Sequence, residues 1–194
     1  MAFIMPASRK PEALIYLLLF SATLLGVYTV ARADAIDVDQ AEIRIVNGLY
    51  LLEARLQYKL TEEAVEALSH GVPLNFKVQL NIAEERSYMW DRDLLSSRHD
   101  YRLEYHALSE QYLVTNMVTG DRHIFLTLSG AVGHLGKVSM ALGDLATLIN
   151  HEDAYAELSA ELDIEALPAP LRPIAYFSPD WHINSPVERV ALPE

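Results

Sequence analysis

The most informative absence is cysteine, of which the 194 residues contain none. Without cysteine the protein has no disulfides, no thiolate metal ligands, no cysteine nucleophile and no lipid-modified N-terminal cysteine. Basic residues are also scarce, because 15 Lys and Arg stand against 27 Asp and Glu and give a formal net charge of -12. Phosphate contacts need clustered basic residues, so nucleic acid is disfavoured as a partner. With 51% hydrophobic and 22% charged residues, the chain is expected to fold around an apolar core.

Motifs that would specify a reaction or a metal are missing as well. The seven histidines are spread along the chain, and none lies three or four residues from another, so we predict no metal site. Gly136 and Lys137 lack the upstream glycine and the following Ser or Thr of a phosphate-binding loop. Ser129 lacks the glycine-flanked turn of a nucleophilic serine. We therefore expect no cofactor and predict that the protein is not an enzyme.

The N-terminal segment has the order of a secretory signal, which is a basic start, an apolar run and a small-x-small ending. Arg9 and Lys10 precede 19 uncharged residues from Ala13 to Ala31, and Ala31-Arg32-Ala33 follows. Cleavage after Ala33 would leave residues 34–194 as a single exported domain. The alternative for residues 1–33 is an uncleaved anchor, because a run of this length approaches the roughly 20 residues that span a bilayer. Either way we predict a periplasmic location for the remainder, free or anchored at the inner membrane.

Apolar and polar side chains alternate in several stretches between residues 43 and 127, which is typical of strands with one buried face. Residues 43–58 predict a hairpin, because Asn47-Gly48 supplies the two positive backbone angles of a tight turn. The later strands are joined by connections too short for a crossover, so the sheet is expected to be antiparallel. These strands are predicted over residues 76–82, 101–107, 112–115 and 123–127.

Two segments predict helices. Thr61 is placed to cap a short helix with Glu62 and Glu63 in its first turn, and Gly71 is placed to end it. Residues 128–150 predict one long helix, because apolar residues recur there at helical spacing. Three glycines in that segment are expected to let another backbone approach the helix closely, and they are Gly130, Gly133 and Gly136.

The C-terminal part has mixed signals. Residues 154–164 fit both a strand and a helix, and of the two we choose the strand. Residues 167–173 contain three prolines and predict no regular structure, whereas residues 181–184 predict a last short strand. The predicted fold is a single α+β domain. Its antiparallel sheet is expected to form a sandwich or a half-barrel, covered by one short and one long helix.

Two stretches stand out because they combine aromatic residues with arginine, and both residue types are enriched at protein interfaces. The alternative is that each stretch lies at the edge of the core, where tryptophan packs and arginine pairs with a carboxylate. The candidate partner-binding residues are Arg86, Tyr88, Trp90 and Asp91 in the first stretch, and Pro170, Leu171, Arg172, Pro173 and Trp181 in the second.

The same stretches carry a family resemblance, in the blocks Asn47–Leu52, Gly71–Phe76, Arg86–Asp91, Leu162–Ile164 and Leu167–Pro173. In order and spacing these blocks resemble the family of domain of unknown function 4390, over about Ile43 to Trp181. One departure is Met89, where the family continues its aromatic run. The resemblance implies a small exported proteobacterial protein with no established activity. The family's genes are often found near a nitrogen-type sensor kinase pair, which implies a role beside a membrane sensor.

Three functional hypotheses follow from these patterns. The first is an exported, non-enzymatic module that binds another envelope protein, such as the extracytoplasmic part of a sensor kinase. The second is a periplasmic carrier, in which the sheet and the long helix enclose a pocket for a small apolar ligand. The third and least favoured is a small hydrolase that uses Asp91, Asp93 and His99, since these residues are more typical of a solvated polar loop.

Overall fold

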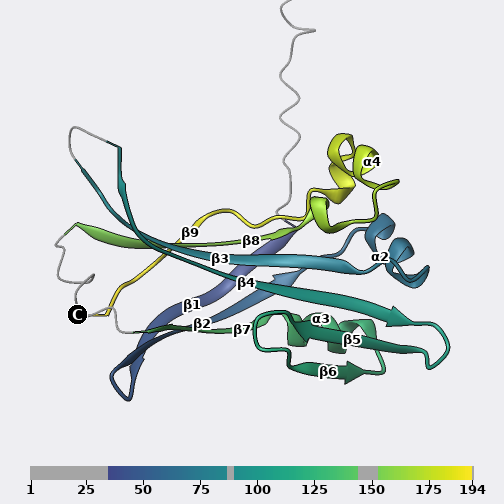
Figure 1. The fold of residues 1–194 in the computed structure, drawn as a ribbon, viewed down its shortest axis with the longest axis horizontal. Helices are drawn as coiled ribbons and strands as arrows, with labels where there is room; N and C mark the ends of the chain where they lie inside the picture. The colour runs from purple at the N-terminus through teal and green to yellow at the C-terminus, as the bar shows by residue number, and fades with distance from the viewer. Residues whose placement is uncertain (1–34, 87–89, 144–152, 194) are drawn as a thin grey trace, which may run out of the picture. The chain divides into compact units, whose positions relative to one another are not determined.

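The computed structural model describes residues 35–86, 90–143 and 153–193 (Figure 1). The predicted signal or anchor over residues 1–33, its cleavage site at Ala33 and the candidate residue Tyr88 lie outside the described residues. Within the part of the chain that the structure describes, no helix is long and apolar enough to cross a membrane.

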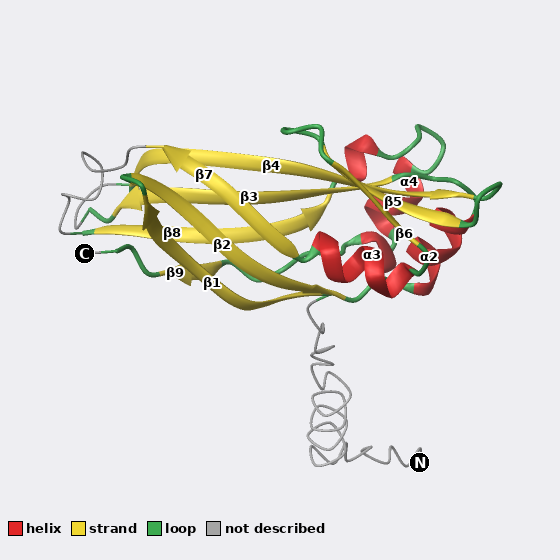
Figure 2. Cartoon of the chain, turned by 90° about the horizontal axis from the view of Figure 1, so that it is seen from below, coloured by secondary structure: helices red, strands yellow, loops and turns green. Residues whose placement is uncertain are grey.

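Nine strands, three α-helices and two short 3-10 helices make up the described part of the chain (Figures 1 and 2). In chain order they are β1 (Ile36–Val46), β2 (Leu49–Tyr58), α2 (Glu62–Ser69), β3 (Leu74–Glu84), β4 (Arg92–His106), β5 (Gln111–Asn116), β6 (Arg122–Phe125), α3 (Leu128–Leu135), β7 (Lys137–Gly143), β8 (Ala154–Leu162), η1 (Ile164–Ala166), α4 (Arg172–Phe177), η2 (Pro179–Trp181) and β9 (Glu188–Val190).

The strands form two antiparallel sheets. One has the order β1-β2-β7, and the other has the order β6-β5-β4-β3-β8-β9. The predicted hairpin is the β1–β2 pair, whose turn residues Asn47 and Gly48 have φ angles of 53° and 79°. The α+β class with antiparallel sheets is thereby confirmed, and the sheets do not close into a barrel.

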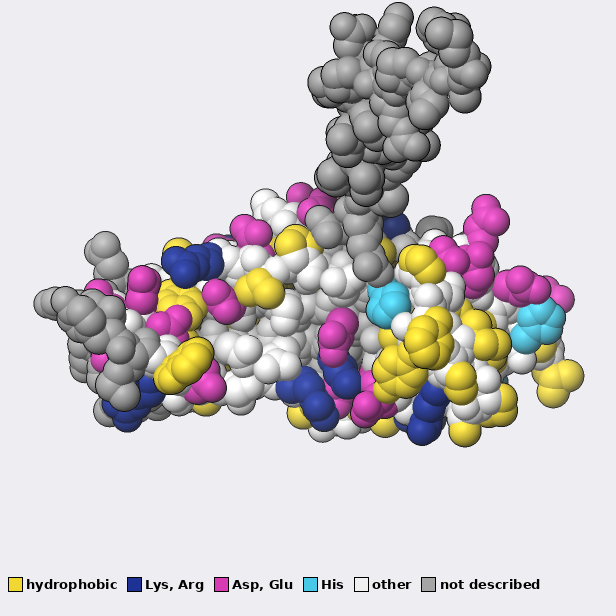
Figure 3. Space-filling model, turned by 90° about the horizontal axis from the view of Figure 1, so that it is seen from above, with side chains coloured by type: hydrophobic (Ala, Val, Ile, Leu, Met, Phe, Trp, Pro, Cys, Tyr) yellow, Lys and Arg dark blue, Asp and Glu magenta, His cyan; other side chains and the backbone are white. Residues whose placement is uncertain are grey.

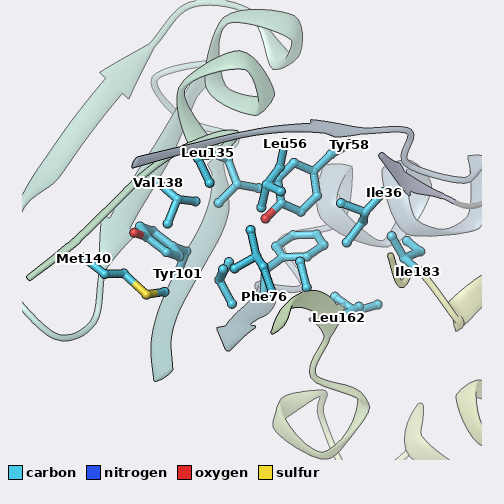
Figure 4. Packing of buried hydrophobic residues seen from close by; sticks show 14 of the residues in the cluster. Ile36, Leu56, Tyr58, Phe76, Tyr101, Leu135, Val138, Met140, Leu162 and Ile183 are labelled. Atoms are coloured by element: carbon cyan, nitrogen blue, oxygen red, sulfur yellow. The ribbon is translucent and has the colours of Figure 1, made fainter. Parts of the chain in front are cut away.

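The core lies between the buried faces of the two sheets. Alternate residues of β3 from Leu74 to Ile82 are fully buried, as the period-two pattern predicted. They meet the buried face of β2, where the Tyr58 and Phe76 rings lie edge to face with centroids 5.0 Å apart (Figure 4). Aromatic pairs in this geometry add stability beyond the burial of their area. The contact between β2 and β3 therefore joins the two sheets.

Helix α2 begins and ends where the sequence predicts. The Thr61 hydroxyl accepts a hydrogen bond of 3.3 Å from the Ala64 amide, and Gly71 has a φ angle of 84° just beyond the helix. The same hydroxyl donates to the carbonyl of Asp180 over 2.8 Å. The cap therefore also ties α2 to η2, a contact between residues far apart in the sequence.

The prediction of one long helix over residues 128–150 is wrong. Helix α3 ends at Leu135, the chain continues as strand β7, and residues 144–152 lie outside the described residues. Val138 and Leu142 fit both periodicities, but here they and Met140 alternate with exposed residues and face the core. The edge of β2 supplies hydrogen-bond partners that an isolated helix pattern cannot reveal, and this tertiary pairing overrides the local pattern.

Gly136 marks the junction between α3 and β7, and of the three glycines expected to admit another backbone it is the one that does so. The Leu56 amide donates to the Gly136 carbonyl over 2.8 Å. A Cβ atom added to Gly136 would lie 2.0 Å from the Leu56 carbonyl oxygen, whereas one added to Gly133 would meet nothing within 4 Å. Only a residue without a side chain fits at this junction.

The boundaries of three other predicted segments also differ from the structure. Residues 154–162 form β8, as chosen, but Pro173 lies in the first turn of α4, so residues 167–173 are not wholly irregular. Proline suits the first turn of a helix because the amide it lacks has no partner there. Trp181 ends η2, and the last strand is β9. The strand predicted over residues 123–127 ends at Phe125.

We predict that Gly136→Ala destabilises the protein by about 1–3 kcal/mol, because the new methyl group overlaps the Leu56 carbonyl. Urea denaturation followed by circular dichroism measures the free energy of unfolding. Gly133→Ala is the matched control on the same helix, and it is expected to be neutral or stabilising by up to about 1 kcal/mol. Equal stabilities for the two variants would contradict the close approach.

Candidate functional site

Of the first candidate stretch, the structure describes Arg86, Trp90 and Asp91, which lie between the end of β3 and the start of β4, here called the hairpin tip. The Trp90 side chain is 92% exposed there. The Asp91 carboxylate accepts hydrogen bonds from the Arg86 amide over 3.4 Å and from the Tyr155 hydroxyl over 2.7 Å. The bond from Tyr155 raises the pKa of that hydroxyl to about 12. Asp91 therefore holds the tip to β8, while Trp90 projects into solvent.

The second candidate stretch surrounds α4. Trp181 is only 6% exposed and belongs to the core. The Arg172 guanidinium donates through Nε to the Leu167 carbonyl over 2.8 Å, so it fixes the start of α4. Leu171 is half-buried, and Pro170 is exposed. Trp181 therefore fits the interpretation that this stretch lies at the edge of the core. Pro170 fits the interpretation that it forms exposed surface.

The structure does not bring the two stretches together. The hairpin tip lies beside Ala154 at the start of β8, whereas α4 follows the other end of that strand at Leu162 (Figure 1). Eight residues of strand separate these ends by roughly 26 Å. One compact partner site that includes both Trp90 and Arg172 is therefore not formed.

Helix α4 presents exposed hydrophobic residues, of which the sequence analysis missed Ile174, Tyr176 and Phe177. Ala175 is its only buried residue, and Phe177 is 90% exposed. The exposed set, here called the α4 surface, comprises Pro170, Pro173, Ile174, Tyr176 and Phe177. In Figure 3, hydrophobic side chains gather toward the right of the view, the side on which α4 lies in Figure 1. The spacing of three and four residues between Pro170, Ile174 and Phe177 was the available signal, and it was lost because the prolines predicted no helix.

The residues of the hydrolase hypothesis are also apart. Asp93 and His99 both lie on β4, not in a loop, and six residues of strand separate them by roughly 20 Å. His99 pairs with Val78, and burial lowers its pKa although Asp100 acts in the opposite direction. Asp91 is bound at the hairpin tip. The described residues do not gather these three groups into one site.

Two histidines that are distant in the sequence do meet. The ring centroids of His123 on β6 and His134 on α3 lie 4.2 Å apart. Burial lowers the pKa of His134, and the neighbouring His123 and Lys137 lower it further. No group of three or more His, Asp or Glu residues is arranged to hold a metal ion in the part of the chain that the structure describes.

A groove of about 700 Å³ lies between β2, α2 and α3. Its walls are formed by β2 residues 55–58 and the two that follow, by Val65 of α2, and by Leu128, Ser129, Val132 and Gly133 of α3. The carrier hypothesis places a pocket between the sheet and a long helix, and in the structure the helix beside this groove is the short α3. The groove contains apolar walls, and its lining includes Arg55 and Lys59 but no carboxylate.

Comparison with known proteins gives one match. A family model described as a domain of unknown function (DUF4390) matches residues 33–191. No curated protein and no solved structure matches the chain. The matched residues include every strand and helix described above.

The two tryptophans are predicted to respond differently to truncation. Trp181→Ala removes a buried side chain and should cost about 3–5 kcal/mol of unfolding free energy. Trp90→Ala removes an exposed one and should change it by less than about 0.5 kcal/mol. Urea denaturation of both variants measures the difference, and similar losses would place Trp90 in the core.

We predict that acid destabilises the protein partly through His134. Its pKa is lowered in the folded state, so the unfolded state binds more protons, and stability is lost as the pH falls below the ordinary histidine pKa. The melting temperature of the wild type should therefore fall more between about pH 7.5 and about pH 5.5 than that of His134→Gln. Thermal denaturation at both pH values gives the comparison. Equal decreases in melting temperature for the two proteins would show that His134 does not contribute to the acid sensitivity.

Proposed function

The chain belongs to the family of domain of unknown function DUF4390, and we propose that it is an exported protein that binds another envelope protein through the α4 surface. It acts by binding rather than by catalysis. The observation that carries the proposal is the exposure of three large hydrophobic side chains on one short helix, Ile174, Tyr176 and Phe177. Contiguous exposed apolar surface on a folded domain marks sites of protein interaction.

The α4 surface is held in place from both ends of the helix. The bond from Arg172 to the Leu167 carbonyl fixes its first turn, and the Tyr176 hydroxyl donates to the Glu165 carboxylate over 3.2 Å. Beneath the helix, the buried Trp181 anchors the following turn in the core. A surface that is rigid before binding loses less conformational entropy when a partner arrives. These contacts therefore support a preformed docking surface.

The composition of the α4 surface favours a protein partner. Its members are aromatic and aliphatic, and the charged side chains of Arg172, at the start of α4, and of Glu165, which accepts from the Tyr176 hydroxyl, adjoin it. An apolar centre with a polar rim is the usual anatomy of a protein interface. The signal-like segment over residues 1–33 supports export, so the partner is an envelope protein, and the extracytoplasmic part of a membrane sensor is one such protein.

We predict that Phe177→Asp abolishes capture of the partner while leaving the fold intact, because a charge replaces the most exposed aromatic residue of the α4 surface. Crosslinking of the tagged protein in cells, followed by mass spectrometry, should show a loss of about tenfold or more in the dominant crosslinked protein.

Trp90→Asp is the matched control, because it changes an equally exposed aromatic residue at the opposite end of β8. Capture should persist in this variant, and the melting temperatures of both variants should match that of the wild type. Loss of capture with Trp90→Asp but not with Phe177→Asp would move the binding site to the hairpin tip.

A further inference from the structure

Strand β7 pairs with only part of β2, and the last residues of β2 have no described strand beside them on that side. Its residues Tyr50 to Arg55 pair with β7, and the last backbone bond on that side runs from the Leu56 amide to the Gly136 carbonyl. At Gly136 the chain departs from the sheet into α3. From Gln57 onward, no described strand occupies the side of β2 that faces away from β1.

The backbone groups of Tyr58 face this open side. The Lys59 amide donates to the Ala35 carbonyl over 2.7 Å and so points toward β1. Successive residues of a strand direct their N–H and C=O groups to opposite edges. The N–H and C=O of Tyr58 are therefore directed into the groove, where an additional strand would find a donor and an acceptor.

The other walls of the groove suit apolar side chains. Leu128 and Val132 on α3 face it together with Val65 on α2. Gly133 also lines it, and the space above its Cα atom is open. A strand placed beside β2 would thus direct alternate side chains toward a hydrophobic wall, which is the arrangement by which strand addition gains specificity.

Positive charge borders the same edge. Arg55 on the outer face of β2 and Lys59, which directly follows the strand, are both exposed, and Lys137 is the β7 residue opposite Arg55. None of the three has an ion pair with a residue that the structure describes, although the chain carries a net charge of -12. Like charges directly opposite each other on neighbouring strands are destabilising. Negative charge on an incoming strand would relieve this repulsion.

We propose that the groove receives an extended acidic segment of a partner protein, which adds to β2 as a further strand. Backbone bonds to Tyr58 align the segment, its apolar side chains face Leu128 and Val132, and its carboxylates face Arg55 and Lys59. The proposal rests on the proposed function in that the occupant is a protein, but it uses a surface distinct from the α4 surface.

The test uses the purified full chain and a fluorescein-labelled peptide of about eight residues that alternates valine and glutamate. Fluorescence anisotropy should show saturable binding. Gly133→Leu, which fills the groove from a position with free space, should weaken binding about tenfold or more. The double variant Arg55→Gln and Lys59→Gln should weaken it similarly without occupying the groove, so the result does not depend on one variant.

Two modified peptides separate the contributions. A peptide with lysine in place of glutamate should not bind, because its charges face Arg55 and Lys59. A valine–glutamate peptide methylated on alternate backbone nitrogens keeps its charge and its apolar side chains but cannot bond to Tyr58, and it should also fail to bind.

Three outcomes overturn the proposal. The first is the absence of binding by the acidic peptide. The second is equal binding of the methylated peptide. The third is displacement of the acidic peptide by palmitate, with palmitate binding weakened to the same extent by Gly133→Leu, which would assign the groove to a small amphiphile. Capture that depends on Phe177 and persists when the peptide fails to bind would leave the proposed function standing. Peptide binding without such capture would contradict the proposed role of the α4 surface but not the proposed role of the groove.

Discussion

The close approach of Gly136 to Leu56 is the contact on which the surrounding structure depends. It ends α3, starts β7 on the edge of β2, and so completes the smaller sheet that covers β3. Because the chain turns away from the sheet at this point, the remaining edge of β2 stays open and α3 lies beside it. One missing side chain thus determines both how the core is closed and where a groove is left.

Much of the sheet could be predicted from the sequence, because a strand with one buried face has apolar residues at alternate positions. The Asn47-Gly48 turn, the buried face of β3 and the Thr61 cap are confirmed, since each is decided by neighbouring residues. The sequence pattern predicts one helix over residues 128–150 because Val138 and Leu142 fit a helical face as well as a strand. The strand is selected by pairing with the edge of β2, which lies about 80 to 90 residues earlier in the chain.

The candidate residues illustrate why surface is harder to predict than secondary structure. Trp90 and Trp181 were both candidates for the same kind of surface, yet one projects from a hairpin tip and the other belongs to the core. Which tryptophan is covered depends on contacts such as that between Thr61 and Asp180, which no local pattern records. The family resemblance is confirmed over residues 33–191, but membership in that family assigns no role to either residue.

The charges around the open edge of β2 also determine which strand it accepts. If two copies of this chain paired through that edge in antiparallel register about Gln57, Arg55 of each copy would face Lys59 of the other. Such like-charge pairs oppose sheet extension, and lysine on edge strands is a common means of preventing self-association. The same side chains attract an acidic strand, so one electrostatic arrangement disfavours a second copy and favours a different partner. An unpaired edge can therefore persist in this protein without leading to sheet-to-sheet aggregation.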